Sequence, residues 1–334
     1  MPIRKISSPG MGKPVGQLAE FFAPVAEELQ QVRNRLREHL ITPYNSVNQQ
    51  IETIGAGRGK MLRPALVLLS GLACGTLRRE HIELAAIVEL VHTATLLHDD
   101  VIDHARTRRN QPTVNCLWGN TAAVLLGDFL LSRAFLACAE LNLPVASKIL
   151  SQTAQRICQG ELLQNLRRAD WTMNQDDYME MIEAKTAALF STACRLGAMV
   201  SEADLPTTES FARYGRGVGL AFQITDDILD ITGDDKKIGK TLGTDAAQKK
   251  QTLPLIHYLQ RQSSNQRKPL LETFFGELEP EKLVQLLNDS GSLDYVRGIA
   301  KHFAAEAAAA IPEQKPAAAA ESLRKIAFAV GNRA

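Results

Sequence analysis

Apolar and polar positions recur along most of the chain with the period of an α-helix. Apolar side chains at helical spacing are found in residues 17–39, 81–104 and 120–141. Residues 65–74 form a shorter apolar run that suits a buried helix. No proline occurs between Pro144 and Pro206, which leaves room for two long helices broken near residues 168–174. No segment of useful length alternates as a strand does, so the pattern predicts an all-α protein.

Length and composition fit one large helical domain. The chain has 334 residues, more than the usual span of about 100–200 for one domain, and only 5% are aromatic. Leu and Ala dominate instead, which favours helices over strands. The first residues are rich in Gly, Pro and Ser. We therefore expect a disordered tail over residues 1–15 and a single domain, a large helical bundle, over residues 16–334.

The net charge and the cysteines indicate which kinds of partner and which cellular compartment to expect. A formal net charge of +1 gives no reason to expect nucleic acid as a partner. The five cysteines are scattered without metal-ligand spacing, which indicates small core residues in a reducing compartment. We identify no apolar run of the roughly 18–20 residues needed to span a bilayer, and no apolar core of a signal peptide. These features predict a cytoplasmic protein without a membrane span.

Two segments carry the same acidic pattern, D-D-x-x-D. The triplets are Asp99, Asp100 and Asp103, and then Asp226, Asp227 and Asp230. Each follows an apolar helical run, and positions i and i+4 share one helix face, so Asp99 and Asp103 point the same way. Anions near a helix C-terminus oppose the macrodipole by about 0.3–1 kcal/mol each. Mg²⁺, a hard ion that binds a few carboxylates together with phosphate oxygens, would offset this repulsion.

The alternative for each triplet is a solvated acidic helix end without a ligand. A single copy leaves both interpretations open, whereas two copies, each followed by basic residues, favour the metal site. Basic side chains also stand near the Gly-rich segment 54–64, at Lys185 and in residues 236–250. Arg and Lys recognise phosphate oxygens, so acid and base around an apolar cavity predict a ligand with a polyanionic end and an apolar end. A network of ion pairs is the competing explanation, but it does not require two triplets.

Other chemistries lack their signatures. The glycine-rich stretch 55–59 is not flanked by a strand, and no G-x-x-x-x-G-K-[ST] motif occurs. No nucleophile–base constellation stands out, and His98 is as suited to orienting a carboxylate as to chemistry. Chemistry through a metal and positioning fits better than a covalent intermediate.

A set of motifs in a fixed order resembles the trans-isoprenyl diphosphate synthases. The motifs are GKMLRP (59–64), ELVHTATLLHDDVID (89–103), RTRRNQPT (106–113), GDFLL (127–131), KTAALF (185–190), FQITDDILD (222–230) and GKTLGTD (239–245). The resemblance covers about residues 50–255, and the remainder is similar only in being helical. It implies an all-α bundle of the isoprenoid synthase type around a central cavity, a homodimer, and the condensation of isopentenyl diphosphate with an allylic diphosphate.

The resemblance also implies a role for each matching residue. Mg²⁺ would join the allylic diphosphate to Asp99, Asp103 and Asp226, with support from Asp100, Asp227 and Asp230. The same diphosphate would contact Arg108, Lys185 and Lys240. Isopentenyl diphosphate would be held by Lys60, Arg63, His92 and Arg109. Near the allylic cation would lie the oxygen dipoles of Thr186 and Gln223, which also counts among the substrate-binding residues, and Lys250 would cap the site.

Two positions depart from the family pattern. Arg58 stands where a glycine usually precedes Gly59, and Asn110 stands where glycine usually follows the arginine pair. Asn tolerates the left-handed backbone conformation better than most residues, so we expect the turn to survive. Arg58 could alter the closure of its loop.

Product length in this family depends on side chains beneath the first triplet. Here Ala94 and Thr95 lie one turn before Asp99, where short-chain members tend to place an aromatic residue. Small side chains leave room for further isoprene units, which favours a long-chain polyprenyl product. The alternatives are a geranylgeranyl or farnesyl synthase with its floor set elsewhere, a non-catalytic subunit of a heteromeric synthase, and a class I terpene cyclase. Non-catalytic subunits typically lose aspartates or binding lysines, all of which are present here. Terpene cyclases generally lack a complete second triplet and the G-K-x-x-R-P segment.

Overall fold

The computed structural model describes residues 20–334 except 58, 109–110, 234–247, 277–278 and 313–316. The tail predicted at residues 1–15 therefore lies outside the described residues. The helices before the first triplet are η1 (Glu20–Val25), α1 (Ala26–Leu40), α2 (Asn45–Ile54), α3 (Leu62–Cys74) and α4 (Arg79–Ile102). The middle of the chain forms α5 (Val114–Trp118), α6 (Asn120–Glu140), α7 (Pro144–Leu166), α8 (Gln175–Ile182), η2 (Glu183–Ala187), α9 (Ala188–Val200) and α10 (Leu205–Thr232). The C-terminal part forms α13 (Leu253–Gln260), α14 (Ser264–Gly276), α15 (Pro280–Asp289), α16 (Ser292–Ala310) and α17 (Ala317–Gly331).

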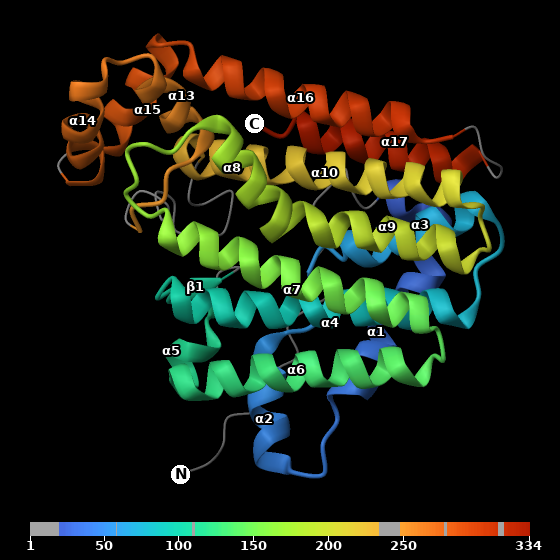
Figure 1. Ribbon diagram of the computed structural model, residues 1–334. Coiled ribbons are helices and arrows are strands. Elements are labelled where there is room, and N and C mark those ends of the chain that lie inside the picture. The colour runs from blue at the N-terminus through green and yellow to red at the C-terminus, as the bar shows by residue number, and fades with distance from the viewer. Residues whose placement is uncertain (1–19, 58, 109–110, 234–247, 277–278, 313–316) are drawn as a thin grey trace.

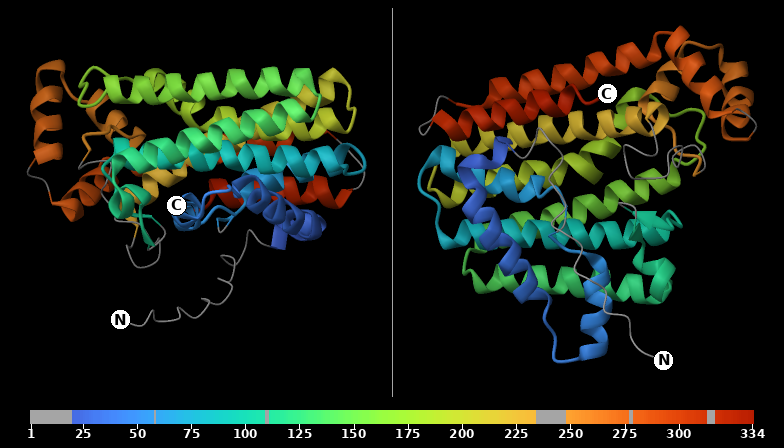
Figure 2. Two further views of the ribbon diagram at one scale, coloured as in Figure 1. Left: turned by 90° about the horizontal axis from the view of Figure 1, so that it is seen from below. Right: turned by 180° about the vertical axis from the view of Figure 1, so that it is seen from behind.

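The all-α prediction is confirmed. In the described part of the chain the only strands are β1 (Thr107–Arg108) and β2 (Gln111–Pro112), which pair antiparallel after α4. Long helices lie side by side, with α16 and α17 along one edge of the bundle and α6 near the opposite edge (Figure 1). Figure 2 shows the same helices from two further sides, with α14 set off at one end.

Helix α4 is central because its side chains are apolar nearly all round. Its middle residues, from Leu84 to Val91, are almost completely buried, and it packs against α1, α3, α6 and α9. Helix α10 plays the same part on the other side of the core, packing against α9, α16 and α17. Both helices that end in an aspartate triplet are therefore anchored by several neighbouring helices.

The structure corrects the first predicted helix. Residues 17–39 were expected as one helix, but residues 20–25 form a 3₁₀ turn that contains Pro24, and the α-helix begins only at Ala26. Proline lacks an N–H group and its ring clashes with the preceding turn, so a regular α-helix starts after it. The predicted break near residues 168–174 is confirmed, because α7 ends at Leu166 and α8 begins at Gln175.

The cysteine prediction is only partly right. All five cysteines are free, and Cys138 and Cys194 are buried as expected. Cys116 and Cys158, however, are exposed on outward-facing positions of α5 and α7. These two thiols are surface residues, not core residues.

The expectation that no apolar run is long enough to span a membrane is also corrected. Helix α6 has the necessary length and hydropathy, although only 39% of its most apolar stretch is buried. Its inner side packs on α4 through residues such as Ala123 and Leu130. Such a helix is weak evidence for a membrane span, because core helices pass the same test.

Candidate active site

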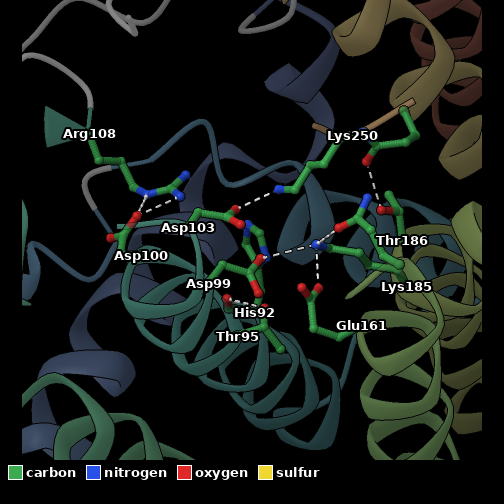
Figure 3. A network of polar contacts seen from close by, with 12 residues as sticks. His92, Thr95, Asp99, Asp100, Asp103, Arg108, Glu161, Lys185, Thr186 and Lys250 are labelled. Atoms are coloured by element: carbon green, nitrogen blue, oxygen red, sulfur yellow. Dashed lines mark hydrogen bonds and ion pairs between the residues drawn. The ribbon is translucent and has the colours of Figure 1, made fainter. Parts of the chain in front are cut away.

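The first aspartate triplet forms the last turn of α4, as the sequence pattern predicts. The N–H of Asp103, the residue that caps the helix, donates to the carbonyl oxygen of Asp99 at 2.8 Å. One helical turn thus connects these two residues on one side of the helix end. Asp100 is buried and faces a different set of partners. The three carboxylates consequently have three different environments, which Figure 3 shows from close by.

Asp99 is surrounded by other charged side chains and is largely buried. Its side chain is 20% exposed, and its Oδ2 atom is 3.9 Å from Lys185 Nζ. Burial raises the pKa of Asp99 to about 6, and the neighbouring carboxylates of Glu161 and Asp103 add to the rise while Lys185 opposes it. Three carboxylates, those of Asp99, Asp103 and Glu161, thus surround one ammonium, and carboxylate oxygens are hard donors that suit a hard divalent cation.

Asp103 is held between two cations from distant parts of the chain. Arg168 Nη2 is 3.1 Å from one carboxylate oxygen, and Lys250 Nζ is 2.8 Å from the other. The amide of Gln248 donates to the carbonyl oxygen of Asp103 at 2.9 Å. Lys250 was expected to cap the site, and its ammonium contacts Asp103 of the first triplet (Figure 3). Arg168 was not identified from the sequence.

Asp100 is paired with Arg108 from strand β1. Nε of Arg108 donates to Asp100 Oδ1 at 2.9 Å, and Nη2 of the same guanidinium is 2.8 Å away. Burial raises the pKa of Asp100, although the pairing with Arg108 opposes this rise. Arg108 was expected on the allylic diphosphate. The pair with Asp100 places its guanidinium at the edge of the first triplet.

Lys185 and Thr186 lie on η2, a single π-helical turn between α8 and α9. The sequence pattern predicted a continuous helix here, so the π-turn is a correction. Thr186 Oγ1 donates to Gln223 Oε1 at 2.8 Å, and Gln223 Nε2 donates to Asp227 Oδ1 at 2.7 Å. The two oxygen dipoles expected near an allylic cation are thus brought together and linked to the second triplet. Such π-turns occur frequently at functional sites.

The second triplet ends α10 as expected. Buried Asp227 accepts a further hydrogen bond from the hydroxyl of Tyr178 at 2.6 Å. Asp226 Oδ1 lies 3.6 Å from Arg333 Nη2, near the C-terminus. Asp230 is half-buried and also has an interaction partner. Tyr178 and Arg333 were missed because nothing in their local sequence marks them.

The predicted ligand set of Asp99, Asp103 and Asp226 does not form a closed cage. Among residues 20–334 outside the gaps, no three His, Cys, Asp or Glu side chains lie close enough together to hold one metal ion.

Three of the four residues expected to hold isopentenyl diphosphate lie in the described part of the chain. Lys60 is exposed just before α3, and Arg63 stacks its guanidinium over the ring of Phe190, 4.3 Å from the centroid. His92 is half-buried on α4, beside the first triplet (Figure 3). Arg109 lies outside the described residues, as does Lys240, which was expected to hold the allylic diphosphate.

The two positions proposed to control chain length lie on α4 below Asp99. Ala94 is fully buried, whereas Thr95 is half-buried and donates its hydroxyl to the carbonyl oxygen of His92 at 2.8 Å. His98, left open between two roles, approaches Asp128 of α6 at 3.3 Å. The same ring nitrogen lies 3.3 Å from the carbonyl oxygen of Val124, so these two contacts of His98 lie outside both triplets.

A family model described as polyprenyl synthetase matches residues 45–289, which include both triplets and the π-turn. The chain belongs to the polyprenyl synthetase family. It is 34% identical to an octaprenyl diphosphate synthase of Escherichia coli, over 86% of this chain and 90% of that protein. It is 36% identical to an all-trans-nonaprenyl-diphosphate synthase of Rhodobacter capsulatus, over 83% and 86% of the two chains. A geranylgeranyl diphosphate synthase of Methanosarcina mazei is also 36% identical, over 72% and 76%.

Solved structures of the family agree with this membership. The structure of a polyprenyl synthase from Caulobacter crescentus, complexed with calcium and isoprenyl diphosphate, superposes with a TM-score of 0.88. The two chains are 34% identical, and the alignment covers 96% of this chain and 99% of that one. The chain therefore has the isoprenoid synthase fold and is a trans-prenyltransferase, as the motifs implied.

Proposed function

We propose that the protein condenses isopentenyl diphosphate with an allylic diphosphate to make an all-trans, long-chain polyprenyl diphosphate. The observation that carries this proposal is the convergence of Asp99 and Asp103 with Lys185, and of Thr186 and Gln223 with Asp227. One group of side chains suits a metal-bound diphosphate, and the other offers oxygen dipoles to a carbocation. A hydrolase or a binding module needs no such second group.

The condensation develops a negative charge and a positive charge at different atoms, and different side chains would stabilise them. The bond between C1 of the allylic substrate and its diphosphate oxygen breaks, and C1 forms a bond with C4 of isopentenyl diphosphate. A proton then leaves C2, and the released diphosphate accepts it. Lys185 would stabilise charge on the departing diphosphate. Thr186 Oγ1 and Gln223 Oε1 would stabilise the positive charge left on the allylic carbon.

We propose Mg²⁺ as the cofactor, held by Asp99 and Asp103 of the first triplet and Asp226 of the second. When bound, it would neutralise the diphosphate and assist its departure. The carboxylate donors, and the calcium and isoprenyl diphosphate named for the similar Caulobacter protein, support a hard divalent cation. Replacing Mg²⁺ with Ca²⁺ in the assay distinguishes a general divalent requirement from a specific one.

A product assay tests the reaction and the chain length together. Purified protein would receive labelled isopentenyl diphosphate, Mg²⁺ and, in separate reactions, geranyl, farnesyl or geranylgeranyl diphosphate. We expect a ladder that extends well beyond twenty carbons, since fully buried Ala94 is small. A ladder that stops at farnesyl or geranylgeranyl diphosphate would establish the short-chain alternative. No condensation with any primer would support the non-catalytic subunit instead.

We also propose that the protein is a homodimer through the outer face of α5, α6 and α7. Large apolar side chains are exposed there, including Trp118, Leu125, Leu136, Leu162 and Leu166. Leu125 and Leu136 are three helical turns apart and so lie on one side of α6. An apolar surface of this kind is typical of an interface. Light scattering after size exclusion should give a dimer, and Leu125→Glu should shift it towards monomer, whereas Leu205→Glu, on α10, should not.

Two organisational proposals remain from the sequence. Residues 16–334 would form one synthase domain after a tail at residues 1–15, and the protein would act in the cytoplasm. The free state of all five cysteines supports a reducing compartment. Limited proteolysis, which should remove only the tail, and cell fractionation test these two statements.

A further inference from the structure

Helix α7 contributes a glutamate to the active site that belongs to neither aspartate triplet. Glu161 forms an ion pair with Lys185, and Gln164, one turn later on the same helix, accepts from Lys185 Nζ at 2.7 Å. In the described part of the chain neither carboxylate oxygen of Glu161 accepts a hydrogen bond from another group. Lys185 is therefore the main neighbour that neutralises this charge (Figure 3).

The backbone around Lys185 is fitted closely to α7. A Cβ atom on Gly160 would lie 2.5 Å from the backbone nitrogen of Lys185, so only glycine permits this approach. On the other side, a Cβ atom on Gly219 of α10 would lie 2.6 Å from Cα of Ala187. The π-turn is thus clamped between α7 and α10. The residue that follows Gly160 is consequently held beside the Lys185 side chain.

The distances distinguish the partners of the Lys185 ammonium. It contacts Glu161 and Gln164 directly but stays 3.9 Å from Asp99. All three charged side chains are at most one-fifth exposed, so their interactions are weakly screened. Without the charge of Glu161, the ammonium would move onto Asp99, the nearest other carboxylate. Asp99 would then be closed to a divalent cation, and Lys185 would point away from the diphosphate.

We propose that Glu161, assisted by Gln164, is a positioning residue that holds Lys185 off Asp99 and presents it to the allylic diphosphate. This inference rests on the proposed function for its substrate, although the contacts themselves do not. Glu161 keeps the cation and its carboxylate neighbour apart until substrate and metal arrive. The ammonium then needs only to rotate from Glu161 towards the diphosphate.

Glu161→Gln tests the proposal, because it preserves the shape of the side chain and removes its charge. We expect kcat to fall by about 10- to 100-fold through misplacement of Lys185. The Mg²⁺ concentration at half-maximal rate should rise, and the KM for isopentenyl diphosphate should stay within about twofold, since Lys185 faces the other substrate. In a Lys185→Ala background the same change should have little further effect.

The matched control is Glu183→Gln at the start of the same π-turn. Glu183 pairs with Arg156 and Arg216 and makes no contact with the Lys185 ammonium among the described residues. Its loss should lower stability without changing the Mg²⁺ requirement. The proposal would be overturned if Glu161→Gln and Glu183→Gln had the same kcat and the same Mg²⁺ requirement. It would also fail if both changes had the same effect in the Lys185→Ala background as in the wild type.

A binding measurement separates this inference from the proposed function. Calorimetry with geranyl S-thiolodiphosphate, an unreactive analogue, would be run at low and high Mg²⁺ on each variant. Weaker binding by Glu161→Gln at low Mg²⁺ that is partly restored at high Mg²⁺ supports the proposal, and unchanged binding refutes it. Wild-type protein that binds the analogue but condenses nothing would refute the proposed function alone. If Glu161→Gln does not fold, Gln164→Leu removes the second contact and should shift the same quantities by a smaller factor.

Discussion

Replacing Asp99 with asparagine should stabilise the metal-free protein at neutral and alkaline pH. The pKa of Asp99 rises from its usual value of 3.8 to about 6 on folding, chiefly through burial. Between these two values the folded state holds more protons than the unfolded state, so stability falls as the pH rises through this window. Above about pH 6 the whole penalty for burying the charged carboxylate is present. Asparagine resembles the protonated carboxyl group and avoids that penalty.

The size of the effect follows from the shift. Each pKa unit is worth 1.36 kcal/mol, so the higher pKa of Asp99 in the folded state predicts that Asp99→Asn gains about 3 kcal/mol in the free energy of unfolding at pH 8. The side chain is 20% exposed, so solvent screening removes little of it. At pH 5 most of the folded wild-type protein carries a protonated Asp99, and the advantage shrinks to about half of that value. With an unfolding entropy of about 2.1 cal/mol/K per residue, the expected rise in Tm is about 4 °C at pH 8 and about 2 °C at pH 5.

The assay is thermal unfolding of wild type and Asp99→Asn in EDTA, in steps from pH 5 to pH 8. Asp289→Asn, at the exposed end of α15, is the matched control and should leave Tm unchanged at every pH. Adding Mg²⁺ together with an unreactive diphosphate should raise the Tm of the wild type more than that of Asp99→Asn. A lower Tm for Asp99→Asn at pH 8, or a difference that does not narrow at pH 5, would refute the reasoning.

Three further substitutions test other parts of the site. Ala94→Phe fills a fully buried position and should shorten the product at a stability loss of about 1–3 kcal/mol; an unchanged product ladder from folded protein would refute the tunnel argument. Tyr178→Phe removes the 2.6 Å hydrogen bond to Asp227 and should lower the free energy of unfolding by about 1.5–3 kcal/mol, measured by urea titration, where no change would contradict the role assigned to the hydroxyl. Arg168→Gln removes the ion pair to one oxygen of Asp103. An ion pair near the surface is worth about 1 kcal/mol, so the half-saturating Mg²⁺ concentration should fall by about fivefold. An increase would show that Arg168 binds the substrate.

The sequence by itself determined the helices and the side chains that share a face within each helix. The period of 3.6 residues is a local property, so an apolar run followed by D-D-x-x-D was enough to predict that Asp99 and Asp103 lie together at the end of α4. The same logic predicted the helix that ends with the second triplet. Residue identity together with motif order also predicted the family and the reaction class.

Only the tertiary structure decided which charges meet across helices. Glu161 faces Lys185, and Arg333 reaches Asp226 from the far end of the chain, because packing of whole helices brings these side chains together. The π-turn at Lys185 depends on Gly160 and Gly219 in two other helices, and a local pattern contains neither. Long-range contacts depend on how the faces of many helices fit at once, so a pattern within one segment predicts which face is buried but not what it touches.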